Sequence, residues 1–310
     1  MIVTVTPSPA IDWTVACDGV QIGAVNRAET AAREPSGKGI NVALALHRAG
    51  IDTLAIVPLG GPTGELFRTL IEHEGVALRD IVIDADCRQN VTLREASGVD
   101  TKINFPGAVL TVEEQRALTQ SVADSLSPGD LLVVAGSLPP GMPAEFFGEL
   151  VTLGHESQAR VILDTSGPAL SAALEAEPDL VTPNREELAE ALGSDVRTLA
   201  DVERGAEQMR DRGARAVLTS LGAHGAYYQD SSSRVYGYVS GVQPVNSVGA
   251  GDALLAGMIA EDTDPEVSLT RALLWGSAAV ESPTTLFLVD SDASHQVHVT
   301  SVIEPSLSLQ

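Results

Sequence analysis

The sequence predicts an α/β fold: a doubly wound, mostly parallel sheet flanked by helices, with a small antiparallel β-sheet beside it. Six short, continuous apolar runs are typical of parallel strands covered on both faces, and they lie at residues 1–6, 53–57, 131–136, 160–164, 180–183 and 216–222. Stretches with helical spacing alternate with these runs, at residues 41–49, 63–74, 111–125, 184–192 and 199–212. Two further segments, about 11–35 and 88–105, alternate polar and apolar positions instead.

The two alternating segments predict a small sheet outside the main layer. Patterns such as VTLREA and TKINF suit strands with one exposed face, and each segment is expected to supply one strand pair. Ordinary surface hairpins fit the same pattern equally well. The expected main domain comprises residues 1–10, 36–87 and 106–310. Residues 11–35 and 88–105 would form a lid.

Composition and charge narrow the classes of function. No apolar run reaches the roughly 18 residues of a membrane span, and the N-terminus has no basic region or cleavage site of a signal peptide. Cys17 and Cys87 are too few for a disulfide framework and lack metal-site spacing, so we expect a cytoplasmic protein. The net charge of −23 argues against nucleic acid as a partner, whereas small anions are compatible with it if cations converge locally.

Several common site motifs are absent from the sequence. In GAGDAL, Leu254 stands where a dinucleotide-binding loop has its third glycine. In PSGKG, Gly39 replaces the Ser or Thr of a Walker loop, and no glycine lies five residues before Lys38. There is no G-x-S-x-G element, and the histidines show no zinc spacing.

One glycine-rich loop is a candidate for phosphate chemistry. In VNSVGAGDALLAG, Gly249, Ala250 and Gly251 run into Asp252 and an apolar helical stretch. Glycines let backbone N–H groups approach an anion, and the start of a helix adds its positive end. Asp252 in the first turn could then accept a proton from an attacking hydroxyl, but an aspartate there commonly only complements the helix dipole.

Three other stretches carry polar residues in suggestive positions. Lys38 and Asn41 in EPSGKGINVA place a cation, backbone donors and an amide around one point, although a turn with Asn41 as helix cap is the simpler interpretation. Asn184 and Glu187 in TPNREEL share one face of a helical turn, where they would organise water around a metal ion or merely cap the helix. LTSLGAHGA reads as a strand that ends in glycines, which suits contact with a nucleotide.

Together and in this order, these motifs resemble the ribokinase/PfkB family of sugar kinases over nearly the whole chain. GKGINVA is similar to the family's N-terminal signature, NSVGAGDALLAG to its C-terminal one and TPNREEL to its Asn-x-x-Glu element. TPSPAID, AVNR, RQNVTL, INFPGAVLT and VAGSLPPG resemble the branch that acts on hexose phosphates. The resemblance implies a ribokinase-like fold whose lid closes over the sugar and commonly pairs between the subunits of a homodimer.

The resemblance also implies a role for each motif. Asp252 would deprotonate a sugar hydroxyl beside an anion hole of Gly249, Ala250 and Gly251. Sugar hydroxyls would bind Asp12, Gly39, Asn41 and Ser137, and the sugar's existing phosphate would bind Arg27, Lys38 and Arg88. ATP would lie against Ser220, Gly222, Gly225 and Ser277. Asn184 and Glu187 would hold Mg²⁺ through water.

Some positions depart from the family pattern. Ser36 replaces the first glycine of Gly-Gly-Lys-Gly, and Ser8 replaces a frequent asparagine. Trp13 stands where a polar or basic residue is usual, which puts the sugar pocket in question. Thr284 replaces a glycine of the family pattern, which puts the local turn and any monovalent-cation site there in question, and the chain after residue 289 matches little.

The expected activity is ATP- and Mg²⁺-dependent phosphorylation of a ketohexose monophosphate, first of all fructose 1-phosphate to fructose 1,6-bisphosphate. Tagatose 6-phosphate and fructose 6-phosphate are the alternative substrates of the same branch. A kinase for an uncharged sugar or nucleoside would not need three cations, which disfavours it. A catalytically silent nucleotide- or sugar-binding regulator on the same scaffold is the alternative from another class.

Overall fold

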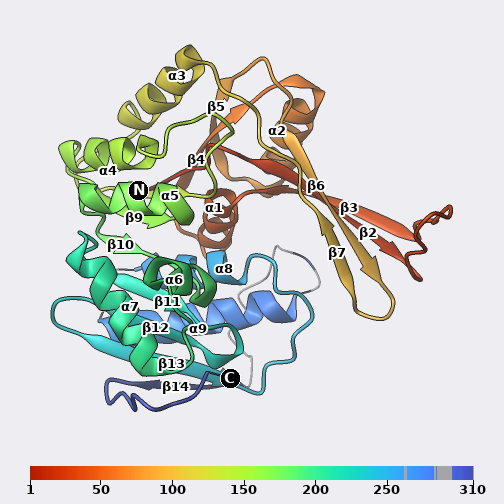
Figure 1. The fold of residues 1–310 in the computed structure, drawn as a ribbon. Helices are drawn as coiled ribbons and strands as arrows, with labels where there is room; N and C mark the ends of the chain where they lie inside the picture. Colours follow the sequence, from red (N-terminus) through yellow and green to blue (C-terminus); the bar gives the residue numbers. More distant parts are fainter. Residues whose placement is uncertain (262–263, 283, 285–294, 310) are drawn as a thin grey trace.

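A ten-stranded sheet forms the centre of the molecule, and a smaller four-stranded sheet projects from one end of it (Figure 1). This computed structural model describes residues 1–261, 264–282, 284 and 295–309. No helix among those residues is both long enough and apolar enough to cross a membrane.

The large sheet has the order β14-β13-β12-β11-β10-β9-β8-β1-β4-β5. Its parallel part runs from β5 to β11 and comprises β1 (Ile2–Val5), β4 (Thr53–Leu59), β5 (Ala77–Val82), β8 (Leu131–Ala135), β9 (Arg160–Asp164), β10 (Leu180–Val181) and β11 (Val217–Ser220). Antiparallel strands extend one edge: β12 (Ala226–Gln229), β13 (Arg234–Ser240) and β14 (Gln296–Thr300). The prediction of a doubly wound, mostly parallel sheet is confirmed.

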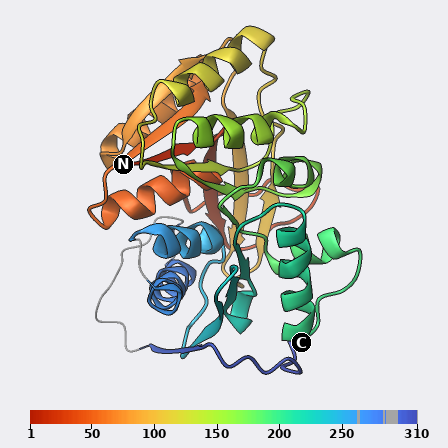
Figure 2. The same cartoon turned by 90° about the vertical axis from the view of Figure 1, so that its left-hand side faces the viewer.

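Helices cover both faces of this sheet, as Figure 2 shows. One face packs against α3 (Val112–Ala123), α4 (Phe146–Glu156), α5 (Gly167–Ala173), α6 (Arg185–Leu192) and α7 (Leu199–Asp211). The other face packs against α1 (Lys38–Arg48), α2 (Gly61–Glu74), α8 (Ala250–Ile259) and α9 (Pro265–Glu281). Strands buried in this way must be apolar on both faces, which explains the continuous runs in the sequence.

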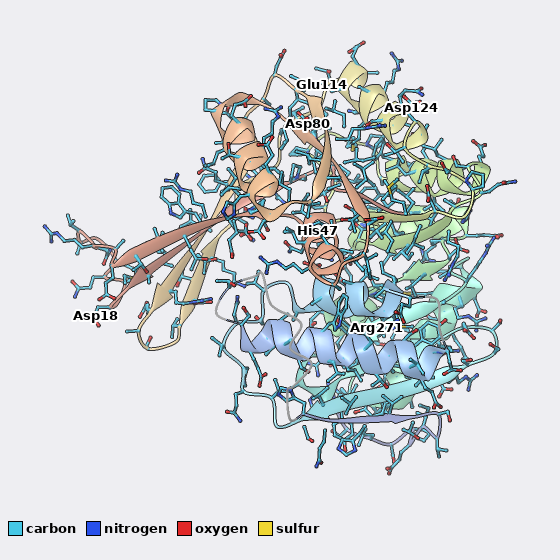
Figure 3. The ribbon with its side chains drawn as sticks, turned by 180° about the vertical axis from the view of Figure 1, so that it is seen from behind. Asp18, His47, Asp80, Glu114, Asp124 and Arg271 are labelled. Atoms are coloured by element: carbon cyan, nitrogen blue, oxygen red, sulfur yellow. The ribbon has the colours of Figure 1, made fainter. Side chains whose placement is uncertain are left out.

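The smaller sheet, which we call the lid sheet, has the order β3-β2-β6-β7. Its strands are β2 (Ala10–Cys17), β3 (Thr30–Ser36), β6 (Arg88–Glu95) and β7 (Asp100–Ile103). Each of the two alternating segments supplies one antiparallel pair, and a parallel pairing of β2 with β6 joins the two pairs. Seen from behind, Asp18 lies near the outer end of the projecting sheet, far from His47 on α1 (Figure 3).

The sequence analysis missed several elements. It assigned no strand to β5, β12, β13 or β14 and no helix to α4, α5 or α9, because their patterns are not distinctive on their own. It also began the first helix at Asn41, whereas α1 begins at Lys38 after Gly37. Asn41 therefore lies inside the helix and is not its cap.

Candidate active site

Asp252 lies in the first turn of α8, directly after the glycine-rich loop. Gly249 has φ of 77° and precedes the helix, a left-handed conformation that glycine adopts without strain. An added Cβ at Gly251 would meet no atom within 4 Å, so the backbone there is open to a ligand. Backbone N–H groups at a helix start that is accessible in this way can bind an anion.

The Asp252 carboxylate is buried and accepts a hydrogen bond of 2.7 Å from Asn41 Nδ2. Burial, helped by the negative charges of Asp164 and Asp12, raises the pKa of Asp252 to about 7, while the Asn41 hydrogen bond and the charge of Lys38 oppose the rise. A general base is most effective when its pKa lies near the working pH. Asp252 therefore has the burial, position and pKa of a proton acceptor.

Lys38, the first residue of α1, joins two carboxylates from different elements. Its Nζ lies 2.9 Å from Asp164 Oδ1 at the end of β9 and 3.8 Å from Glu187 Oε1 on α6. Burial alone would lower the pKa of Lys38, but Asp164 and Glu187 outweigh it and hold the pKa above its ordinary value. The structure thus gathers one cation and three carboxylates, those of Asp164, Glu187 and Asp252, around one point.

Asn184 and Glu187 form a reciprocal helix cap. Asn184 Oδ1 accepts from the Glu187 N–H at 2.8 Å, and Glu187 Oε2 accepts from the Asn184 N–H at 2.9 Å. The simple interpretation as a cap is therefore geometrically right for Asn184. Glu187 does more than cap, because its second oxygen faces Lys38, and burial raises the pKa of Glu187 despite that cation.

On the lid sheet, Asp12 is held by two hydrogen-bond donors. Ser36 Oγ donates to Asp12 Oδ2 at 2.7 Å, and Asn90 Nδ2 donates to Asp12 Oδ1 at 2.9 Å. Ser36, one of the departures from the family pattern, therefore orients a candidate sugar ligand. Trp13 points to the opposite face of β2, because successive residues of a strand alternate. There its ring lies 4.3 Å from the Arg33 guanidinium, so it does not share Asp12's face.

Arg88 begins β6 and approaches the same region. It donates to Ser8 O at 2.9 Å and to Phe105 O at 3.4 Å, and its buried Nε has no hydrogen-bond partner. Burial lowers the pKa of Arg88, while the nearby charge of Asp12 acts in the opposite direction. A half-buried guanidinium beside Asp12 with a donor to spare can receive an anionic group.

Gly39 provides close contact between α1 and β1. A Cβ there would lie 2.5 Å from Thr6 Oγ1 and 3.2 Å from Val5 O, so only glycine lets the start of α1 approach this strand end.

Ser137 is exposed after β8 and follows Gly136, whose N–H donates to Asp164 O. Arg27 is the outlier: it is exposed in the connection between β2 and β3, and the structure does not bring it to the other candidates.

A cleft of about 1100 Å³ opens beside this cluster. Its lining includes the four candidate nucleotide residues together with one metal candidate and two loop residues: Ser220, Gly222, Gly225, Ser277, Asn184, Ala250 and Gly251. Gly225 has φ of 90°, and a Cβ there would lie 1.9 Å from Gly237 O, which explains the glycine. The cleft thus leads from the glycine-ended strand β11 to the helix start that carries Asp252.

The sequence analysis missed three residues of this cluster. Asp164 ends an apolar strand, and polar residues at the carboxyl ends of parallel strands commonly face the site of an open α/β sheet. That signal was present in RVILD. Asn90 had no comparable signal, because its role depends on the pairing of β6 with β2. Ser36 was noted as a departure, but its partner Asp12 depends on the pairing of β2 with β3.

Comparison with known proteins agrees with this geometry. A family model described as pfkB family carbohydrate kinase matches residues 5–291. A 1-phosphofructokinase from Bacillus subtilis is 34% identical over 260 residues, which cover 84% of this chain and 85% of that protein. The structure of Escherichia coli phosphofructokinase-2 in complex with fructose-6-phosphate has a TM-score of 0.85 at 33% identity and covers 90% of this chain and 93% of that one.

The tetrameric inhibited form of the same Escherichia coli protein has a TM-score of 0.85 at 34% identity, again over 90% of this chain and 93% of that one. The matched family region includes the lid sheet, the Lys38 helix start, the Asn184 cap and the Asp252 loop. A buried aspartate at an accessible helix start, beside a cleft, suits phosphoryl transfer to a hydroxyl. This chain belongs to the pfkB family of carbohydrate kinases and is a phosphotransferase.

Proposed function

We propose that the protein transfers the γ-phosphoryl group of ATP to a hydroxyl of a ketohexose monophosphate, with fructose 1-phosphate as the preferred substrate and fructose 1,6-bisphosphate as the product. The observation that carries the proposal is Asp252, a buried carboxylate of raised pKa at the start of α8, between the cleft and the lid sheet. Asp252 would take the hydroxyl proton while the N–H groups of Gly249, Ala250 and Gly251 bind the transferred phosphoryl group.

The sugar would lie between the lid sheet and α1. Asp12 is already oriented by Ser36 and Asn90, and the buried Asn41 Oδ1 has no hydrogen-bond partner in the protein, so it can accept from a sugar hydroxyl. Arg88 would bind the phosphate that the sugar already carries. A polar site of this kind discriminates strongly, because a wrong sugar leaves its buried groups unpaired.

Lys38 would act nearer the point of transfer than the resemblance implies. Its contacts with Asp164 and with Glu187 of α6 support this role, because the start of α6 lines the cleft. For Arg27, binding the sugar's phosphate would require a rearranged lid sheet or a second copy of the chain.

Mg²⁺ would be held mainly by the ATP phosphates and by water that Asn184 and Glu187 orient. Among the residues that the structure describes, no group of three His, Cys, Asp or Glu side chains is placed to bind a metal directly. Excess carboxylate charge around Lys38 nevertheless favours a cation, and Mg²⁺ usually retains several waters. The ion would supply positive charge to the phosphates during transfer.

A homodimer through the lid sheet and a cytoplasmic location complete the proposal. Trp13, Val15, Val91 and Leu93 share the sheet face opposite Asp12 and are all half-exposed, which suits contact with a second lid sheet. The two cysteines are free, as expected in a reducing compartment. Light scattering on the purified protein in solution would measure the mass of the assembly.

A panel of sugar monophosphates tests the substrate. We expect kcat/KM for fructose 1-phosphate to exceed that for fructose 6-phosphate and tagatose 6-phosphate at least about tenfold, which is about 1.4 kcal/mol of transition-state discrimination. The reverse ranking would refute the substrate assignment and leave the phosphotransferase standing. A thermal shift with ATP but no ADP from any sugar phosphate would instead support a silent regulator.

A further inference from the structure

Residues 304–309 lie on the opposite face of the large sheet from the core on which β14 packs. The preceding strand β14 pairs with β13 at the edge of the large sheet, and the chain then returns to the helices of the opposite face. Figure 2 shows this dark blue segment running along the lower edge and ending beside α7. None of the sequence motifs assigns it a role.

The segment completes the start of α7. The first N–H groups of a helix have no partner within the helix itself. Here the Leu199 N–H donates to Leu307 O at 3.1 Å and the Ala200 N–H donates to Pro305 O at 2.9 Å. The segment of residues 304–309 therefore holds the turn that precedes α7.

The end of the segment is also tied to the start of α6. The Leu309 N–H donates to Arg197 O at 2.8 Å, and Arg185 Nη1 donates to Leu309 O at 2.6 Å. Arg185 follows Asn184, the helix cap beside the phosphoryl end of the cleft. Two helix starts that border the cleft are thus held by the same short segment.

Leu309 itself belongs to the wall of the cleft. Its side chain is 1% exposed and joins the main core, and it lines the cleft together with Ala189 and Val196. Val242 and Pro244 line the same cleft from the connection between β13 and α8. Apolar residues from separate elements offer a site for the apolar face of a base, whereas the phosphates would lie near Gly251.

We propose that residues 304–309 form a clamp that holds Leu309 and the turn before α7 as one wall of the nucleotide cleft. This inference rests on the proposed use of that cleft by ATP. Leu309 is a positioning residue for the base end of the nucleotide and does not contribute to phosphoryl transfer. Because coupling between sites is reciprocal, bound nucleotide should in turn stabilise the docked segment.

Leu309→Ala tests the clamp, with Leu307→Ala as the matched control. Leu307 is a half-buried leucine of the same segment that packs on the same core and does not line the cleft. Calorimetric titration with the nonhydrolysable analogue AMP-PNP and Mg²⁺ would measure nucleotide affinity, and titration with fructose 1-phosphate would measure the sugar site. Steady-state kinetics would separate KM for ATP from kcat.

We expect Leu309→Ala to weaken AMP-PNP binding about tenfold, which corresponds to about 1.4 kcal/mol. Its kcat at saturating ATP and its affinity for fructose 1-phosphate should stay within about twofold of the wild type. Leu307→Ala should change none of the three by more than about twofold. Unchanged nucleotide affinity in Leu309→Ala, or an equal loss in both variants, would overturn the role of Leu309.

Hydrogen exchange on the unmodified protein gives a second test that needs no stable variant. AMP-PNP with Mg²⁺ should slow exchange of the Leu199, Ala200 and Leu309 amides, and fructose 1-phosphate alone should not. Equal exchange with and without bound nucleotide would refute the coupling. If the wild type bound no AMP-PNP at all, the proposed function itself would fail, an outcome distinct from either result above.

Discussion

Replacing Asn41 by alanine should change the pH at which the enzyme loses activity. Asn41 Nδ2 donates to the charged carboxylate of Asp252 at 2.7 Å and thereby lowers its pKa, which burial has raised to about 7. A hydrogen bond to a charged group contributes about 1.5–3 kcal/mol, and one pKa unit corresponds to about 1.4 kcal/mol. Without the amide, the pKa of Asp252 should rise by about one to two units.

The consequence for the rate follows from the fraction of Asp252 that is deprotonated. At about pH 7 that fraction should fall from about one half to between roughly one tenth and one hundredth, so kcat/KM should fall about five- to fiftyfold. At about pH 9 most of this pH-dependent loss should be recovered, because about one half to nine tenths of Asp252 is then deprotonated in the variant. Any loss from the missing sugar contact of Asn41 should remain at every pH. A coupled assay of ADP release between about pH 6 and pH 9.5 would measure this profile.

Asn90→Ala is the control for the Asn41 experiment. Asn90 donates to Asp12 and not to Asp252, so its loss should weaken sugar binding without moving the acidic limb of the profile. A loss in Asn41→Ala that is the same at every pH would refute the reasoning. It would show that Asn41 acts through the sugar alone.

Three further predictions concern neighbouring residues. Asp252→Asn should lower kcat at least about a hundredfold with AMP-PNP binding retained. The folded-state pKa of Asp252 lies above the ordinary value of 3.8, so the charged carboxylate lowers the stability of the wild type as pH rises through about 7. The variant should therefore melt several degrees higher than the wild type at about pH 8 but not at about pH 4. Lys38→Met should lower kcat more than tenfold, with KM for the sugar phosphate changed less than about threefold. An effect on KM alone would show that Lys38 instead binds the phosphate that the sugar already carries. Gly39→Ala should lower the free energy of unfolding by about 1–3 kcal/mol through its contact with Thr6, whereas Gly148→Ala, with no neighbour nearer than 3.5 Å, should not.

Local sequence patterns predict much of the fold. Strands buried on both faces must be apolar throughout, so runs such as 131–136 and 160–164 mark the centre of the sheet. Strand β10 contributes only Leu180–Val181, and β12 to β14 form an antiparallel edge with mixed residues. Such elements depend on pairing with segments far along the chain, and a short window of sequence does not identify those segments.

The loop of Gly249 to Asp252 shows the same division within the site. Glycine spacing and an acid in the first helical turn predict a place where an anion and a proton acceptor meet. The raised pKa of Asp252 arises from burial and from the charge of Asp164, and Lys38 and Asn41, which both lie on α1, oppose the rise. The sequence alone therefore determined which side chains and backbone turns are available. Only the tertiary structure decided their charges and partners, because desolvation and Coulomb energy depend on distances that the folded chain creates.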